Sequence, residues 1–537
     1  MLRLLLAFTL ALALPGEELK LQVLATADTH AAVMPEDPYT LQAKPKGWAR
    51  LAPLVRELQA RNPHTLLVDV GDTIQGEPIA YVRHRVHPEL PDPGTAILNA
   101  LGAHAMVVGN HDFDFGLSTL RQVEEQAKHP WLAANVVDAG RGKPAFTPYA
   151  VVEVKGLRVA ILGLANSALE RLVEADRRPG LKVLDAVETA RAWVPRLRDQ
   201  EKADLVIVAI HGGLGDGSAT PGAEHQARAL AEQVKGIDLV LAGHSHVPVA
   251  TRCGGVPVLQ PAAHAAALGI AELTLQKAKG RWSVTACELR GQAPAADAAP
   301  DPEVLKLTEA LRRHTDAYLD TPAAALETPL DGRWSRMEDS AVLQLIHRVQ
   351  RQATGAELSF AASPRSRYYV PRGPVSIRQL WPLAAFEDRV ARLRLTGAQV
   401  RAWLEHGARF YAFCHEPQLY NPAVAPWDFD LLDGLDFTLD LSRPVGHRVT
   451  RLLHRGKPVS DQQSFTVAVS SRRLTGAGGF LEAVGFRGEP EAVTPQSLRN
   501  LLFEYALARP SLELPLRNAW RIVPWLERER VLAQQPD

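Results

Sequence analysis

Cysteine is scarce in this sequence, with three residues in a chain of 537. So low a count excludes a small scaffold held together by many disulfides. In an oxidising compartment Cys253 and Cys287 are candidates for one pair, which would leave Cys414 over. The sequence alone does not tell whether their Cα atoms come close enough to pair.

An excess of charge is also missing, because 60 basic residues balance 60 acidic ones. Affinity for DNA or RNA comes largely from surplus lysine and arginine on phosphates, so we expect no nucleic acid polymer as a partner. Hydrophobic residues make up 46% of the chain and charged residues 22%. This is the composition of a folded globular protein, and it excludes extensive disorder.

Long hydrophobic runs are absent as well. The largely apolar run Leu4–Leu14 has 11 residues, whereas a helix needs about 20 to span a bilayer. With Arg3 before it and the small-residue pattern Ala11–Ala13 near its end, this run is typical of a secretory signal peptide, which we place at residues 1–16. The alternative is a first buried strand or helix of the fold. We expect a periplasmic or secreted protein, no stable membrane span and a monomer.

The length predicts two to four domains. In residues 17–290, short β-branched or apolar runs alternate with helical patterns at 49–61 and 186–200. Strand–helix alternation predicts a layered α/β domain. The strand-like runs are Leu19–Ala25, Thr65–Val70, His104–Val108, Val159–Leu164, Asp204–Ile210 and Asp238–Ala242.

A change of composition marks the end of this domain. Residues 292–302 read QAPAADAAPDP, which is typical of a linker, and residues 303–318 have a helical pattern. We assign 291–321 to a linker and connecting helix and 322–537 to a C-terminal domain. That domain mixes predicted helices at 339–353 and 396–408 with predicted strands at 390–395, 436–441 and 464–470.

Polar clusters follow directly after several predicted strands, where loops converge in open α/β sheets. In chain order the candidate residues are Asp28 and His30; Asp72; Asn110, His111 and Asp114; His211; His244 and His246. Imidazoles and carboxylates are the ligands preferred by borderline divalent cations such as Zn²⁺ and Mn²⁺. The donors exceed what one four-coordinate ion needs, and they fit two divalent metal ions sharing a bridging carboxylate. Such a pair clamps a phosphoryl group and makes hydroxide available near neutral pH.

The spacing within the clusters suggests how the donors meet. If Asp28–His30 is extended, residues i and i+2 point the same way and reach one ion; His244–His246 repeats this pattern. In His111–Asp114 an i, i+3 spacing puts the imidazole and the carboxylate on one face of a helical turn. The carboxylate would then raise the pKa of the histidine and favour its proton-donating form.

Each cluster alone has a simpler interpretation as a turn, a helix cap or a surface histidine. The joint order D-x-H, GD, GNHD, H and GHSH, each after a strand-like run, is much less frequent by chance. We assign the other 13 histidines, including His264, to structural or surface roles.

Longer strings around these clusters resemble the calcineurin-like metallophosphoesterases, and within them the secreted 5′-nucleotidase family. The similarity to 2′,3′-cyclic-nucleotide 2′-phosphodiesterase/3′-nucleotidases is greatest in GDTIQG and in the FGL ending. The strings are GDTIQGEP (71–78) with Tyr81, GNHDFDFGL (109–117), WLAANV (131–136) and GHSH (243–246). In the second half they are Thr396-Gly397, DLLDGL (430–435), Gly456-Lys457-Pro458 and GAGGF (476–480).

The resemblance implies a four-layer metallophosphoesterase β-sandwich domain, a connecting helix and a C-terminal substrate domain. It also implies that Asp28, His30 and His246 hold a first metal, and that Asn110, His211 and His244 hold a second. Asp72 would bridge the two, and His111, backed by Asp114, would act on the phosphate. The family's base-stacking ring maps onto Trp427, with Asp428 and Phe429 adjacent; Trp427 or Phe429 is equally well a core residue.

The sequence departs from the family at the second base-stacking ring. The family pattern is close to NNYR, whereas this chain has Ser470-Ser471-Arg472-Arg473. An arginine stacks on a base and still contacts phosphate, so Arg472 is our candidate for this position. Arg365, Arg367 and Arg372 replace a usual Gly-rich stretch, and we expect them to be solvated.

Three functions remain open at this point. The first is hydrolysis of small-molecule nucleotides, 2′,3′-cyclic nucleotides and 3′-nucleotides above all, by metal-hydroxide attack on phosphorus. The second is a 5′-nucleotidase or UDP-sugar hydrolase. The third is a binding protein that has lost catalysis on the same scaffold, which only the departure at Ser470–Arg473 favours.

Overall fold

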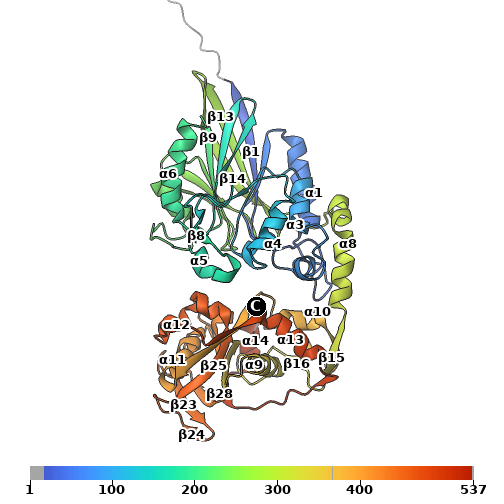
Figure 1. The fold of residues 1–537 in the computed structure, drawn as a ribbon, viewed down its shortest axis with the longest axis vertical. Coiled ribbons are helices and arrows are strands. Elements are labelled where there is room, and N and C mark those ends of the chain that lie inside the picture. Colours follow the sequence, from blue (N-terminus) through green and yellow to red (C-terminus); the bar gives the residue numbers. More distant parts are fainter. Residues whose placement is uncertain (1–16, 364, 366, 535–537) are drawn as a thin grey trace, which may run out of the picture. The chain divides into compact units, whose positions relative to one another are not determined.

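A computed structural model describes residues 17–363, 365 and 367–534, so the expected signal peptide at residues 1–16 lies outside the described part. The described residues form two compact units (Figure 1). The first reaches Glu309, except for the short segments Asp37–Gln42 and Gly76–Val82. Those segments belong to the second unit, which otherwise starts at Ala310.

The first unit is built on two six-stranded sheets. The first sheet has the order β14 (Arg281–Gln292), β13 (Leu268–Ala278), β1 (Glu18–Thr26), β2 (Thr65–Asp69), β3 (Ala105–Val107), β4 (Trp131–Leu132). The second has the order β11 (Val249–Cys253), β12 (Val256–Gln260), β10 (Leu239–Ala242), β9 (Leu205–Ile210), β7 (Leu157–Leu164), β6 (Tyr149–Val154). All six strands expected in this region are confirmed.

Side chains that alternate along the strands join the two sheets into one sandwich. Ile207 of β9 lies in a buried cluster with Val23 of β1, whereas its neighbour Val208 lies in another cluster with Ala190 of α6 (Ala186–Asp199). Successive residues of a strand face opposite sides, so one face of the sheet packs on the other sheet and the opposite face packs on a helix.

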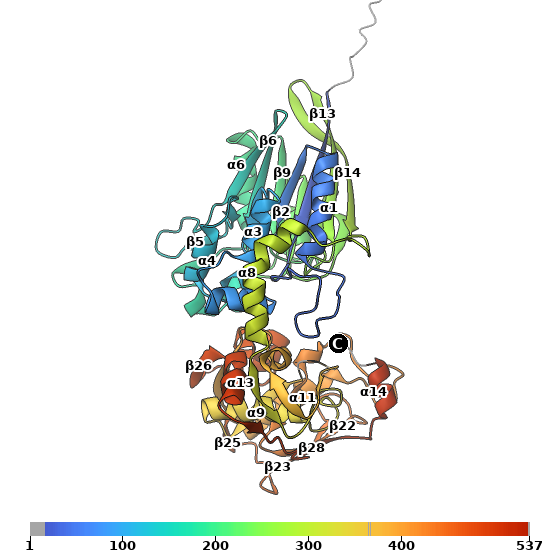
Figure 2. The same cartoon turned by 90° about the vertical axis from the view of Figure 1, so that its right-hand side faces the viewer.

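Helices cover the outer faces of both sheets. Helices α1 (Trp48–Arg61) and α3 (Pro93–Ala100) lie on the side of the first sheet and α6 on the side of the second (Figures 1 and 2). The predicted four-layer α/β architecture is therefore confirmed, as are the two helices predicted at 49–61 and 186–200.

A helix follows the predicted linker. Strand β14 ends at Gln292 and α8 spans Pro302–Leu319, so the residues between them are outside regular elements, as expected. Asp301 begins the helix: its carboxylate accepts the backbone N–H groups of Glu303 (2.9 Å) and Val304 (3.0 Å). The compact units divide within this helix, between Glu309 and Ala310.

The second unit has a five-stranded sheet with flanking helices and smaller sheets. Its order is β21 (Asp430–Asp433), β17 (Leu358–Ala362), β25 (Ser464–Ser470), β20 (Arg389–Thr396), β26 (Ala492–Ser497). A four-stranded sheet has the order β24 (Lys457–Pro458), β23 (Val449–His454), β22 (Asp436–Asp440), β28 (Trp520–Val523). Its main helices are α9 (Ala341–Thr354), α11 (Gly397–Gly407) and α13 (Leu498–Leu507). The strands and helices predicted for this domain are confirmed.

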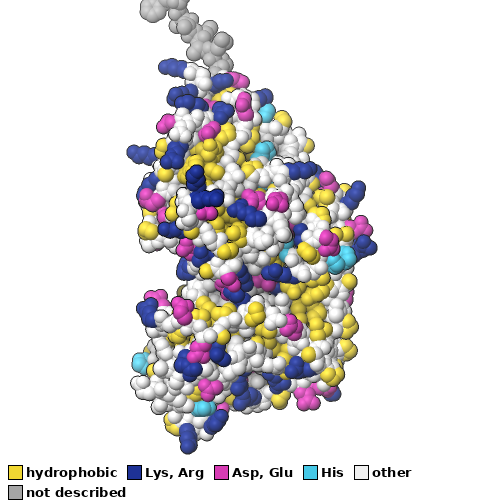
Figure 3. Space-filling model, in the orientation of Figure 1, with side chains coloured by type: hydrophobic (Ala, Val, Ile, Leu, Met, Phe, Trp, Pro, Cys, Tyr) yellow, Lys and Arg dark blue, Asp and Glu magenta, His cyan; other side chains and the backbone are white. Residues whose placement is uncertain are grey.

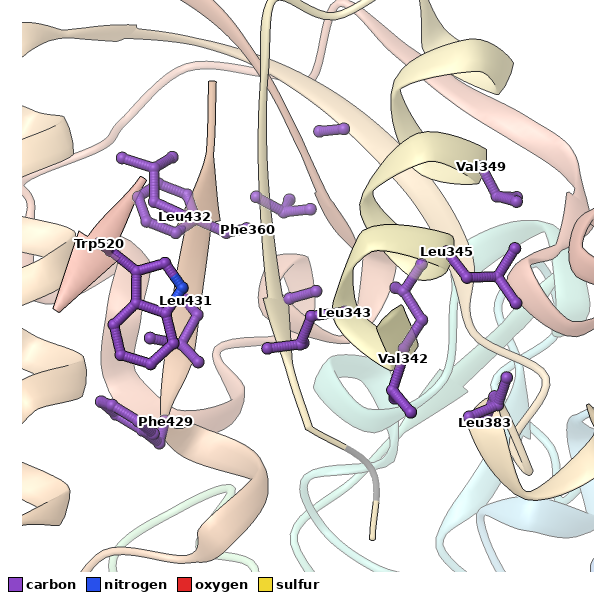
Figure 4. Close-up of a cluster of buried hydrophobic side chains, with 14 of the residues drawn as sticks. Val342, Leu343, Leu345, Val349, Phe360, Leu383, Phe429, Leu431, Leu432 and Trp520 are labelled. Carbon is purple, nitrogen blue, oxygen red and sulfur yellow. The ribbon is translucent and has the colours of Figure 1, made fainter. Parts of the chain in front are cut away.

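The core of the second unit lies between its sheets and helices. Figure 4 shows Phe360 of β17 and Leu432 of β21, which are paired across the strands, near Trp520 of β28. The ring of Phe360 also stacks on Trp403 of α11, with centroids 5.0 Å apart. These contacts place β21 in the core of the second unit.

Two further predictions concern cysteine and membranes. Cys253, Cys287 and Cys414 are free and buried, so the structure has no bond between the candidate pair.

None of the helices in the described residues has the length and apolar character needed to cross a bilayer. On the face shown in Figure 3, basic and acidic side chains are interspersed, in line with the balanced composition.

Candidate metal centre

The loops after parallel strands hold one another through backbone hydrogen bonds. The N–H of Asp28 donates to the carbonyl of Gly71 (2.8 Å), and the N–H of His30 donates to that of Asp72 (2.9 Å). No side chain fits at Gly109, because a Cβ there would lie 2.2 Å from Asp72 Oδ1. The glycines of the GD and GNHD motifs therefore allow the two backbones to approach closely, and the same motifs supply candidate metal ligands.

Asp112, which the sequence analysis did not single out, fixes these loops. Its buried carboxylate accepts N–H groups from four residues at 2.7–3.2 Å. Its donors are Gly109, Asp72, Thr73 and Ile74. Burial and the charge of Asp72 raise the pKa of Asp112 to about 6, although the four N–H groups oppose the shift. Asp112 positions the loops and offers no free ligand atom.

The first group of candidate ligands consists of Asp28, His30 and His246, whose donor atoms lie within 4.8 Å of one another. The Nε2 atoms of His30 and His246 are 3.1 Å apart, and His246 Nε2 is 3.5 Å from Asp28 Oδ1. Two buried residues and one exposed histidine thus converge, which leaves the site accessible from one side.

The second group consists of Asp72, His211 and His244, with donor atoms again within 4.8 Å. His211 Nε2 lies 3.1 Å from Asp72 Oδ2 and 3.2 Å from the side-chain oxygen of Asn110. Asn110 therefore lies where the predicted fourth donor is needed.

Asp72 belongs to the second group and also lies close to the first. Its Oδ2 is 3.1 Å from His211 Nε2 in the second group and 3.9 Å from His30 Nε2 in the first. Its other oxygen, Oδ1, accepts the backbone N–H of His111 (2.7 Å). This position fits a carboxylate that bridges two cations.

Hydrogen bonds behind His30 and His211 decide which ring nitrogen of each is free. His30 Nδ1 lies 3.0 Å from the carbonyl of Gln75, and His211 Nδ1 lies 2.6 Å from that of Val70. A carbonyl only accepts, so each Nδ1 carries the hydrogen and each Nε2 keeps a lone pair for a cation. The donor set thus fits a pair of divalent ions in its chemistry as well as its spacing.

Glu224, which no sequence pattern singled out, plays the same part for His244. Its Oε1 lies 2.8 Å from His244 Nε2, so that nitrogen donates and Nδ1 is left free. Burial would raise the pKa of Glu224, but the His244 hydrogen bond is the larger influence and lowers it to about 2. Glu224 lies well away from any predicted strand end, so the rule used to find the other residues did not reach it.

The extended conformation predicted for Asp28–His30 and His244–His246 is wrong. All four of these aspartate and histidine residues have positive φ angles, between 49° and 70°, as does Asp72. A left-handed backbone costs a non-glycine residue about 1–3 kcal/mol and is concentrated at functional sites. The donors converge through tight turns, which the i, i+2 rule for strands did not anticipate.

The carboxylates of Asp28 and Asp72 strongly favour a positive charge beside them. Burial alone would lower the pKa of His211, but Asp72 and Asp28 raise it to about 10. Burial prevails at His30, whose pKa falls to about 4. The pKa of Asp72 lies well below its ordinary value because of His211 and His111, even though burial opposes this. A divalent cation would meet the same demand and displace the proton from His211.

The predicted pair His111 and Asp114 meets at a helical turn. Residues His111–Phe113 form a 3₁₀ turn, and His111 Nδ1 lies 2.8 Å from Asp114 Oδ2. Burial would lower the pKa of His111, but Asp114 and Asp72 raise it to about 9. On its other side, Asp114 Oδ1 is 3.4 Å from Arg177 Nη1. The i, i+3 spacing is thus confirmed.

His264, which we assigned to a structural or surface role, lies beside the first group. Its ring centroid is 5.4 Å from that of His30 and 5.5 Å from that of His246. Its backbone N–H donates to the carbonyl of Asp28 (2.8 Å). The loop that carries His264 therefore supports the first group.

The residues predicted to bind the base lie in the second unit and differ in exposure. The side chain of Trp427 is 50% exposed, and the guanidinium carbon of Arg472 lies 5.9 Å from its ring centroid. Phe429 requires correction: it is 1% exposed and stacks on Phe410, so a substrate has no access to its ring. It is a core residue because β21 begins immediately after it.

At the departure Ser470–Arg473, the last residue has a structural role. Arg473 is buried and pairs with Asp428 (2.6 Å) and Asp430 (2.7 Å), so it holds the loop that carries Trp427. Of the other arginines singled out, Arg372 lies 2.9 Å from Glu327 and its side chain is 70% exposed, as expected for a solvated group.

Comparisons with known proteins agree with this geometry. The family model for the calcineurin-like phosphoesterase matches residues 21–248, and the model for the 5′-nucleotidase C-terminal domain matches residues 319–485.

Similar curated proteins cover most of the chain. The trifunctional nucleotide phosphoesterase protein YfkN of Bacillus subtilis is 26% identical over 94% of this chain, which spans only 39% of that protein. A 2′,3′-cyclic-nucleotide 2′-phosphodiesterase/3′-nucleotidase of Haemophilus influenzae is 27% identical over 96% of this chain and 89% of its own length.

Solved structures share the fold. A 5′-nucleotidase precursor from Thermus thermophilus has a TM-score of 0.67 and 24% identity, over 94% of this chain and all of that chain. A candidate 5′-nucleotidase from Staphylococcus aureus has a TM-score of 0.79 and 20% identity, over 94% of this chain and 99% of that one.

Proposed function

We propose that this chain hydrolyses 2′,3′-cyclic nucleotides and 3′-nucleotides. The premise is that it is a phosphoric ester hydrolase, in which a calcineurin-like phosphoesterase domain is joined to a 5′-nucleotidase C-terminal domain. The phosphoesterase domain implies divalent metal ions, and the structure contains two groups of residues able to hold them. The observation that carries the proposal is Asp72, whose carboxylate lies between the two groups.

Two divalent ions bound there would supply an activated water and neutralise charge that develops on the phosphoryl oxygens. Asp28, His30 and His246 would hold one ion, and Asn110, His211 and His244 the other, with Asp72 between them. His111, held by Asp114, would keep a proton on Nε2 near neutral pH because its pKa is raised.

His111 is the proposed proton donor to the leaving oxygen. In a 2′,3′-cyclic nucleotide, a water that has released one proton to solvent forms a new bond to phosphorus, and the bond to the ribose 2′ oxygen breaks. That oxygen accepts the proton from His111 Nε2, and a 3′-nucleotide results. A second hydrolysis at the same centre then releases phosphate and the nucleoside.

Trp427 and Arg472 are the proposed contacts of the base. An exposed indole with a guanidinium near its ring offers a stacking surface in the second unit. Stacking tolerates any base, so this pair predicts nucleotide binding with little base selectivity.

The alternative substrate class is 5′-nucleotides or UDP-sugars. It is supported by relatives named Protein UshA, one of which, from Escherichia coli, is 24% identical over 79% of this chain. The cyclic-nucleotide assignment is favoured because three relatives are named 2′,3′-cyclic-nucleotide 2′-phosphodiesterase/3′-nucleotidase. They are 26–27% identical and cover 84–96% of this chain.

We also propose Mn²⁺ or Zn²⁺ as the bound ions, since imidazole and carboxylate ligands suit both. A signal peptide at residues 1–16, a periplasmic or secreted location and a monomeric state complete the proposal.

A substrate panel tests the assignment. Rates with Mn²⁺ are compared on 2′,3′-cyclic AMP, 3′-AMP, 5′-AMP and UDP-glucose. The proposal expects the first two to be preferred, with 3′-AMP appearing as an intermediate of the cyclic substrate. A preference for 5′-AMP without ring opening would replace it with the alternative.

A further inference from the structure

A polar cavity lies in the second unit, at the end of β21 opposite to Trp427. Its volume is about 390 Å³, within the range of small-molecule pockets. Trp427 precedes β21, whereas Asp433, which lines the cavity, is the last residue of that strand. The cavity is therefore separate from the proposed base contacts.

Three arginines from two segments line this cavity. Arg348 and Arg351 are one turn apart on α9, and Arg517 comes from the segment between β27 (Ser511–Leu512) and β28. Guanidinium groups are planar forks that match the oxygens of phosphate groups. Convergence of three such groups is a recurrent way to bind an anion.

The positive charge exceeds the negative charge by two in this cavity. Among the described residues that line it, Asp433 is the single acidic one. Its oxygens are shared by Arg351 Nη1 (2.8 Å) and Arg517 Nη1 (3.0 Å). Arg348 Nη1 instead donates to a neutral partner, the carbonyl of Glu513 (2.8 Å). One carboxylate thus faces three cations.

The arginines are held in place yet keep donors for a ligand. Each guanidinium has five N–H donors. Side-chain contacts with described residues use two donors of Arg351 and one each of Arg348 and Arg517. The anchor itself is fixed: the side chain of Asp433 is 6% exposed, and although burial opposes it, His347 and Arg517 keep its pKa below the ordinary value. Ordering these side chains in advance lowers the entropic cost of binding.

The backbone leaves the cavity open at the end of α9. Gly355 has a left-handed φ of +66°, and the nearest heavy atom to a Cβ built there would be Arg392 Nη1, at 3.8 Å. Glycine therefore ends the helix at this position without filling the cavity.

We propose that this cavity binds a small anion through its phosphate group, either inorganic phosphate or the phosphate of a nucleotide. The proposal does not depend on the substrate assignment above, because its residues contact none of the candidate metal ligands. A purely structural role, in which the arginines only tie α9 to residues 513–517, is the competing outcome.

Equilibrium dialysis of the full chain against inorganic phosphate, 5′-AMP and adenosine tests the proposal. Each is measured on the metal-loaded protein and again after chelation, since phosphate held by the metal centre is lost on chelation and phosphate in this cavity is retained. The variants are Arg348→Gln/Arg517→Gln and, as a matched control, Arg487→Gln, an exposed arginine of the same unit. Thermal unfolding confirms that each variant is folded.

We expect saturable binding of one phosphate or one 5′-AMP by the chelated protein, at least tenfold weaker in the double variant and unchanged in Arg487→Gln. The tenfold figure is a lower bound for losing two charge-assisted contacts. Binding of phosphate itself identifies the free ion as a ligand, and binding of 5′-AMP alone identifies a nucleotide. No saturable binding after chelation, equal binding by the double variant, or equal binding of adenosine and 5′-AMP would overturn the proposal.

Discussion

Replacing Asp114 by asparagine should weaken His111 as an acid without removing it. The carboxylate of Asp114, 2.8 Å from His111 Nδ1, is the main reason that the pKa of this histidine is raised to about 9. Asparagine keeps the size of the side chain and loses its charge. The pKa of His111 should therefore fall towards its ordinary value of about 6.5.

The expected magnitude follows from the protonated fraction at a given pH. At pH 7.5 a group with a pKa of about 9 is roughly 97% protonated, whereas one with a pKa of about 6.5 is roughly 10% protonated. Because a general acid works only in its protonated form, Asp114→Asn should lose about tenfold in rate at pH 7.5. It should lose much less near pH 6. His111→Ala should lose roughly 10²–10⁴-fold below about pH 9, where His111 of the wild type is protonated.

The assay is the pH profile of kcat/KM for 3′-AMP with saturating Mn²⁺. The rate should fall as pH rises through the pKa of the acid, so the alkaline limb of Asp114→Asn should move to lower pH. Arg177→Gln is the control, because it removes the cation on the other side of Asp114 and should not move that limb to lower pH. An alkaline limb that is identical in wild type and Asp114→Asn would refute this role.

The remaining predictions concern the metals and the base. Glu224→Gln should lower the affinity of the second site for metal by roughly 10–100-fold, because Glu224 supports a ligating histidine. Arg171→Gln, which changes only the partner of the other Glu224 oxygen, should leave that affinity unchanged. Isothermal titration with Mn²⁺ distinguishes the two variants. Metal-free protein should lose stability as pH rises from about 6.5 through about 10, because the raised pKa of His211 stabilises the fold only while that histidine is protonated. Urea unfolding between pH 6 and 10 measures this, and a free energy of unfolding that does not change with pH would contradict it. Trp427→Ala should raise KM for 3′-AMP by roughly 5- to 150-fold, from about 1–3 kcal/mol of stacking, without changing KM for glycerol 2-phosphate. Trp525→Ala, which removes another exposed tryptophan of the same unit, should change neither.

The strands and the larger helices could be predicted because their signals are local. Runs such as 205–210 are apolar at every position, as a strand buried on both faces requires. The polar residues that follow these runs could be found for the same reason, since parallel strands deliver their carboxyl ends to one edge. His111 and Asp114 could be paired because a helical turn fixes the i, i+3 spacing.

What the sequence did not predict depends on contacts between distant segments. Glu224 and His264 follow no predicted strand, and they reach the site only through the packing of their loops. The left-handed turns at Asp28 and His244 are imposed by neighbouring backbone, so an isolated tripeptide gives no sign of them. Phe429 is adjacent to an exposed tryptophan, yet the start of β21 carries it into the core.

Metal content per chain tests the central claim most directly. Wild-type protein and Asp72→Ala, which removes the carboxylate that lies close to both groups, are loaded with Mn²⁺, freed of excess ion and analysed by mass spectrometry of the element. The account predicts two ions per wild-type chain and loss of both in Asp72→Ala, because each ion then lacks the proposed bridging donor. One ion or fewer in the wild type, or two ions retained by Asp72→Ala, would contradict it.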